Sequence, residues 1–116
     1  MGTSYTTERI DDEYMAALTP SGTHYSKAFI WHGWSQKLLL ILADQQVTVS
    51  IMYTMNTEYP LPNNAEFYVL TTAKNVVLAA NEIIPFGVED PVHFVKVKID
   101  TGLNPTNVRI LALGSR

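Results

Sequence analysis

The C-terminal part of the chain holds two stretches in which apolar and polar residues alternate with a period of two. They are Val92–Ile99 (VHFVKVKI) and Asn107–Leu113 (NVRILAL), and the turn-rich segment Asp100–Thr106 (DTGLNPT) joins them. Successive side chains of a β-strand point to opposite faces of the sheet, so alternation over this length is typical of a half-buried strand. The pair therefore predicts two β-strands, and it constrains the chain to a fold that contains a sheet.

The chain between residues 24 and 91 supplies five further strand candidates separated by turn signals. These candidates are His24–Trp31, Ser35–Leu42, Gln46–Met55, Glu66–Thr72 and Asn75–Ala80. We interpret Asn56–Ala65, with its two prolines and three asparagines, as a loop and Asn81–Pro91 as a connection. About seven short strands with no long helical period between them predict an all-β domain over residues 24–116, an antiparallel β-sandwich of the jelly-roll or Ig-like kind.

Residues 1–23 differ from the rest and are predicted to form an N-terminal arm. Within them Glu8–Leu18 carries acidic residues near its start, and Ile10, Tyr14 and Leu18 recur at intervals of four. This spacing predicts a short amphipathic helix. Such a helix is not stable alone in water. We therefore expect the arm to dock either on its own sandwich or on a neighbouring subunit, and both possibilities remain open.

Several strand candidates are apolar on both faces. Leu38–Leu42 shows no alternation, and Leu111 and Leu113 lie on the face opposite Val108 and Ile110. A sandwich buries one face of each sheet in its core, so the second apolar set needs another cover. Either Ile83–Phe86 and the arm cover it, or another copy of the chain does. The candidate interface residues are Ile10, Tyr14, Leu18, Phe94, Leu111 and Leu113.

The composition narrows the classes of partner. Charged residues make up 16% of the 116 residues, against about 25% in an average soluble domain. Either Thr, Asn, Gln and Ser cover the surface, or other copies of the chain bury part of it, and we expect a homo-oligomer. The net charge is −3 without a basic run, so no nucleic-acid partner is expected. The longest apolar run, Leu38–Ala43, is too short to span a bilayer, and no membrane partner or secretory signal is expected.

No motif for catalysis, metal binding or cofactor binding is visible. The chain has no cysteine, and His24, His32 and His93 share no metal-ligand spacing. The acidic clusters Asp11–Glu13 and Glu89–Asp90 lack the pattern of a calcium loop. No G-x-S-x-G, P-loop or GxGxxG motif is present. We therefore expect a protein that is not an enzyme and has no cofactor, although a site assembled through space stays open.

The aromatic residues allow a second interpretation. Trp31 and Trp34 flank a His-Gly turn, and Tyr59 lies in the predicted loop. Aromatic rings can stack on the apolar faces of sugars. These three residues are the candidate ligand-stacking residues of a carbohydrate-binding β-sandwich module, which is the alternative to a self-associating structural subunit.

The C-terminal half resembles small all-β proteins of bacteriophage virions over residues 66–113. The resemblance is carried by the apolar connection Ile83–Phe86, the strand Phe94–Ile99, the segment Thr101–Pro105 and the final strand Val108–Ile110. It implies a capsid-decoration or tail protein located in the virion, acting as a symmetric oligomer with other virion proteins as partners. It implies no catalytic residues.

Overall fold

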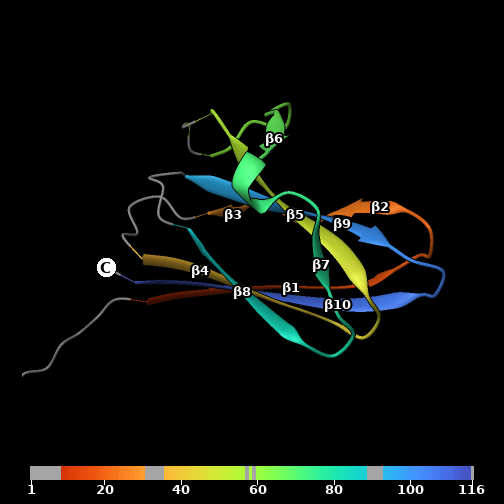
Figure 1. The fold of residues 1–116 in the computed structure, drawn as a ribbon. Helices are drawn as coiled ribbons and strands as arrows, with labels where there is room; N and C mark the ends of the chain where they lie inside the picture. The colour runs from red at the N-terminus through yellow and green to blue at the C-terminus, as the bar shows by residue number, and fades with distance from the viewer. Residues whose placement is uncertain (1–8, 31–35, 57, 59, 89–92, 116) are drawn as a thin grey trace, which may run out of the picture.

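The structure, a computed structural model, describes residues 9–30, 36–56, 58, 60–88 and 93–115 and shows two antiparallel sheets packed face to face (Figure 1). Sheet A contains, in spatial order, β1 (Arg9–Leu18), β10 (Thr106–Ser115), β4 (Gln36–Ala43) and β8 (Ile83–Val88). Sheet B contains β2 (Thr23–Tyr25), β9 (Phe94–Thr101), β5 (Val47–Thr54) and β6 (Phe67–Val69), with β3 (Phe29–Ile30) also on β9 and β7 (Val76–Leu78) also on β5. The predicted all-β sandwich is confirmed.

The strand pairing has the order of a jelly roll. If β2 with β3, and β6 with β7, are each counted as one interrupted strand, the first strand pairs with the last, β1 with β10. The second pairs with the next to last, β9, and the third with the sixth, β4 with β8. The fourth and fifth, β5 and β6 with β7, are also partners. A long double strand wrapped around a core in this way is the jelly-roll form of the β-sandwich. Of the two predicted forms, jelly-roll and Ig-like, the pairing of the described strands is that of the jelly roll.

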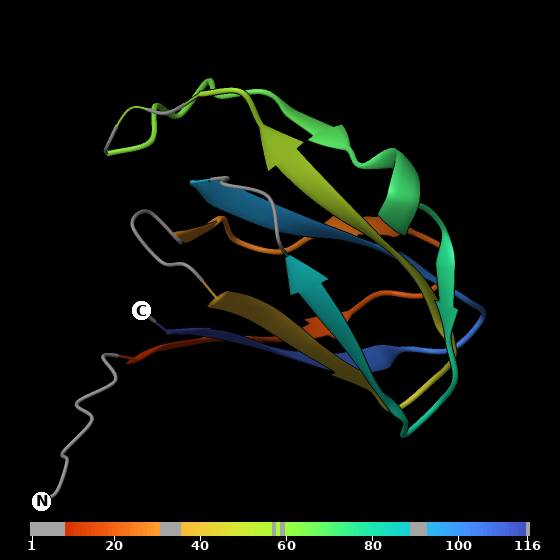
Figure 2. The ribbon, with the colours of Figure 1, turned by 60° about the vertical axis from the view of Figure 1, so that its left-hand side comes forward.

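The core lies between the two sheets and is lined by alternate residues of the long central strands. The two layers are seen from a second direction in Figure 2. Burial of aliphatic side chains of this size contributes about 1.5–3 kcal/mol each. The buried cluster consists of Leu18, Phe29, Leu39, Ile41, Ala43, Val47, Val49, Ile51, Leu78, Val95, Val97, Ile99, Val108, Ile110 and Ala112.

The predicted N-terminal helix is wrong, because Arg9–Leu18 forms strand β1. A spacing of four residues fits one face of a helix and also one face of a strand, so Tyr14 and Leu18 share a side in either structure. The ladder with β10 extends over the whole of β1, from Arg9 opposite Ser115 to Leu18 opposite Thr106. Pairing of this length outweighs the weak helical tendency of an isolated segment. Residues 9–18 therefore belong to the sandwich of their own chain.

The expected connection after residue 80 also contains a strand. Ile83–Val88 forms β8 at the edge of sheet A, where it pairs with β4. Pro85 is compatible with this position, because an edge strand can leave one side without a donor. The sequence left open that Ile83–Phe86 and the arm cover the second apolar face. In the structure β1 and β8 are the edge strands of sheet A, so neither strand lies over the outer face of that sheet.

The predicted strand His24–Trp31 is interrupted inside its described part. The chain pairs with β9 through β2, leaves the ladder at Ser26–Ala28, and pairs again through β3. The buried Ser26 hydroxyl accepts the N–H of Val97 at 2.9 Å and donates to the carbonyl of Lys27 at 2.8 Å. A side chain thus replaces a backbone acceptor that the interruption removes.

The predicted strand Glu66–Thr72 is shorter than expected. It contains β6 and then the 3₁₀ turn η1 (Thr71–Ala73), after which the chain returns to β5 as β7. Asn75 takes a positive φ of 52° at this return, and its N–H donates to the buried Ser50 hydroxyl at 2.9 Å. The two short strands together form one interrupted edge of sheet B.

Candidate functional site

The outer face of sheet A is apolar along its two central strands. In β4, Leu38, Leu40 and Leu42 alternate with core residues and are partly exposed. In β10, Leu111 and Leu113 do the same. The register places Leu40 opposite Leu111 and Leu38 opposite Leu113, so the five leucines form one continuous patch.

Side chains from both edge strands enlarge this patch. Met15 of β1 is 67% exposed and Ile83 of β8 is 60% exposed. The ladders align Met15 with Arg109, Arg109 with Leu42, and Leu42 with Ile83, so one row crosses all four strands. We name the seven apolar residues on this side the leucine face. They are Met15, Leu38, Leu40, Leu42, Ile83, Leu111 and Leu113.

The described charges on this side of sheet A, Glu13 and Arg109, lie among the apolar residues of the leucine face and compensate each other. Glu13 Oε2 accepts from Arg109 Nε and Nη2, each at 2.6 Å. Both side chains are partly exposed, so the pair contributes little to folding. Its importance is electrostatic, because covering the face would not leave either charge without an opposite partner.

The other predicted interface residues lie elsewhere. Leu18 and Phe94 are buried by their own chain, with 7% and 0% exposure, so they are not on the surface of the described fold. Tyr14 is partly buried and packs against the core. The side chain of Ile10 lies outside the part that the structure describes. Leu111 and Leu113 are therefore the predicted residues that reach an outer face.

Met15 and Ile83 are not among the predicted interface residues. Their contribution depends on strand register, which aligns β1 and β8 with the central strands. The apolar run Leu38–Leu42 is the sequence signal for this face, because it shows that β4 is apolar on both sides.

A second candidate surface is a hollow of about 290 Å³ on sheet B. It lies between the β2–β3 link, the Leu61–Ala65 loop, Phe67 and Lys96. The Lys96 ammonium lies 4.7 Å from the centre of the Phe67 ring, so that ring face is already in a cation–π contact. Trp31, Trp34 and Tyr59, the candidate sugar-stacking residues, lie outside the described residues. The described part of the hollow therefore offers no free aromatic platform.

The described side chains show no arrangement for metal chemistry. No group of three His, Asp or Glu side chains within the described ranges is placed to hold a metal ion. His24 Nε2 lies 3.0 Å from the carbonyl oxygen of Thr19, and the His93 ring is tilted against Phe94. His32 lies outside the described residues. In the same ranges, no helix is long and apolar enough to cross a membrane.

The chain matches no protein-family model and no curated protein sequence. The fold and the chemistry of its surfaces are therefore the basis on which a function can be proposed.

Proposed function

We propose that this protein is a non-enzymatic structural subunit that associates with copies of itself and serves in a bacteriophage particle, as a capsid-decoration or tail component. The observation that carries the proposal is the leucine face. Five partly exposed leucines with exposed Met15 and Ile83 form one apolar surface across sheet A. Apolar patches of this kind on a small domain mark sites of protein interaction.

The size and fold of the chain agree with this role. A face of four strands spaced about 4.8 Å apart, in which β4 has 8 residues, measures roughly 19 by 27 Å, or about 500 Å². This value is the footprint of the whole outer side of sheet A, within which the leucine face occupies the centre. Jelly rolls recur in viral capsid proteins, and this analogy at the level of the fold supports the virion role. The low charged fraction, 16%, fits a chain that buries part of its surface in an assembly.

The test is the state of the full chain in solution. Multi-angle light scattering over a wide concentration range should give a mass above that of one chain, and electron microscopy of the same sample should show uniform particles. A protein that remains strictly monomeric at the highest concentration would contradict the proposal.

A further inference from the structure

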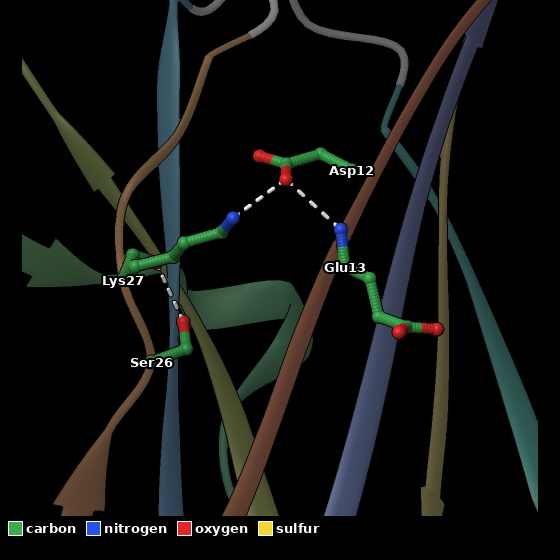
Figure 3. A network of polar contacts seen from close by, with 4 residues as sticks. All are labelled: Asp12, Glu13, Ser26 and Lys27. Carbon is green, nitrogen blue, oxygen red and sulfur yellow. Dashed lines mark hydrogen bonds and ion pairs between the residues drawn. The ribbon is translucent and has the colours of Figure 1, made fainter.

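The free edges of the two sheets are poorly suited to pairing with another strand. At one edge of sheet A, the N–H of Glu13 in β1 donates to Asp12 Oδ1 at 2.9 Å (Figure 3). The same oxygen accepts from Lys27 Nζ at 2.5 Å. The Asp12 carboxylate thus occupies a backbone donor on the edge strand and ties it to the β2–β3 link of sheet B. Charged groups placed in this way disfavour addition of a strand.

The remaining edges have other obstacles. In β8 the central residue Pro85 has no N–H, and a proline in an edge strand leaves the missing donor on the solvent side. The edges of sheet B consist of short pieces, with 3 residues in β2, 2 in β3, 3 in β6 and 3 in β7. Short and interrupted edge strands give little backbone for an added strand. Self-association through the described strands therefore favours a face over an edge.

The two outer faces differ in what they offer. On sheet B, the outward residues of the central strand β5 include the buried Ser50, Met52 and Thr54, and β9 presents Lys96, Lys98 and Asp100. The exposed apolar side chains on that side, Tyr25, Ile30 and Val77, lie on the short edge strands and form no row across the sheet. On sheet A, the leucine face remains partly exposed, and its adjacent charges, Glu13 and Arg109, are paired. Two such faces of about 500 Å² each would bury roughly 1,000 Å², the lower limit for a specific interface.

From these observations we infer that a second copy of this chain covers the leucine face, sheet A against sheet A, in a closed dimer. The inference rests on the proposed self-association. It specifies which surface mediates that association and how many chains associate. A face that packs on the same face of another copy uses both surfaces at once, so association ends at two chains. Leu40 and Leu111 lie opposite each other on the central strands and fall in the middle of the contact.

The test compares charged substitutions on the two outer faces in the full chain. Analytical ultracentrifugation of the wild type over a range of concentrations should reach a plateau at twice the mass of one chain. Leu40→Glu places a charge in the middle of the leucine face and should weaken the dimer about 100-fold or more. Val77→Glu is the matched control, because Val77 is an aliphatic residue, 60% exposed, on the outer side of β7 in sheet B. It should leave the dimer intact.

Circular dichroism establishes that each variant is folded, and Leu111→Gln serves as a second substitution if Leu40→Glu does not fold. A wild type that stays monomeric would overturn both this inference and the proposed function. A plateau at another mass, or a dimer that neither Leu40→Glu nor Leu111→Gln weakens, would overturn the face-to-face dimer and leave the proposed self-association standing. A dimer lost in the sheet A variants and retained in Val77→Glu supports the inference.

Discussion

The last two strands of the chain belong to different sheets, and their outward residues differ in kind. β9, in sheet B, presents Lys96, Lys98 and Asp100 on the outside, whereas β10, in sheet A, presents Arg109, Leu111 and Leu113. Both strands bury valine and isoleucine on the inside. The inner residues of both strands are apolar because they form the core. The outer residues differ because the two sheets have different surroundings.

The difference between the outer faces distinguishes two kinds of burial. Val95 and Val97 of β9 face the core, so Phe94, which precedes Val95, lies on the opposite side of the strand. Phe94 nevertheless has 0% exposure. Its own chain covers it. Leu111 and Leu113 point away from the core of sheet A and remain partly exposed. Substitutions at Phe94 should therefore affect the single chain, and substitutions on the leucine face should affect the assembly.

The largest expected effect on folding comes from Phe94→Ala. Removal of a fully buried aromatic side chain costs about 3–5 kcal/mol, because burial is lost and a cavity remains. Chemical denaturation should show this loss at every protein concentration. The control is Ile30→Ala, since Ile30 pairs with Phe94 and is 40% exposed. If both variants lost the same small amount of stability, the sheet B surface would not be covered as the structure shows.

The next effect concerns Leu113→Ala on the leucine face. A partly exposed leucine contributes less to the folding of one chain, so unfolding at high dilution should lose about 1 kcal/mol or less. At high concentration the wild type should gain stability from association, and the variant should gain less. The measurement is the thermal midpoint of both proteins as a function of concentration. Parallel curves for the two proteins would argue against a role of Leu113 in assembly.

Ser26→Ala on sheet B should destabilise the folded chain less than Phe94→Ala and more than Leu113→Ala. The substitution leaves the N–H of Val97, a residue with 0% exposure, without its side-chain acceptor. Loss of a partner for a buried donor costs about 1–3 kcal/mol. Thr23→Ala is the matched control in the same edge, because the Thr23 hydroxyl donates to Asp100 at an exposed position. Denaturation midpoints should separate the two variants, and equal midpoints would contradict the assigned role of Ser26.

The sequence predicts most clearly those strands in which apolar and polar residues alternate. Val92–Ile99, Asn107–Leu113 and Gln46–Met55 correspond to β9, β10 and β5. β1 was missed because its four-residue spacing fits a helix and a strand equally well. β8 was missed because Pro85 and Gly87 interrupt its apolar pattern.

The candidate site was predicted in part for a related reason. The surplus of leucine in β4 and β10 is a local property, and it identified the centre of the leucine face. Met15 and Ile83 join that face through register with distant segments, which no local pattern specifies. Phe94, a predicted interface residue, is in phase with Lys96 and Lys98 on the outward side of β9, but its own chain buries it, and no local pattern specifies that cover.

The smallest expected effect lies at the exposed edge of sheet B, where the hydroxyl of Tyr68 donates to Glu66 Oε2 at 2.5 Å. This hydrogen bond, followed by the negative charge of Glu66 and slight desolvation, raises the pKa of Tyr68 above its ordinary value. The neutral phenol is thus favoured in the folded chain. Its contribution to stability is present below the ordinary tyrosine pKa and is lost as the pH rises through the raised value.

Glu66→Gln removes the charge and should lower the pKa of Tyr68 toward its ordinary value. Ultraviolet absorbance of tyrosinate gives the titration, and Tyr68→Phe identifies the contribution of this one residue among the 6 tyrosines. Because Tyr68 is 56% exposed and belongs to sheet B, the change should leave the oligomeric mass at neutral pH unaltered. An altered mass in Glu66→Gln would mean that the sheet B edge takes part in assembly, and the contrast between the two faces would then no longer hold.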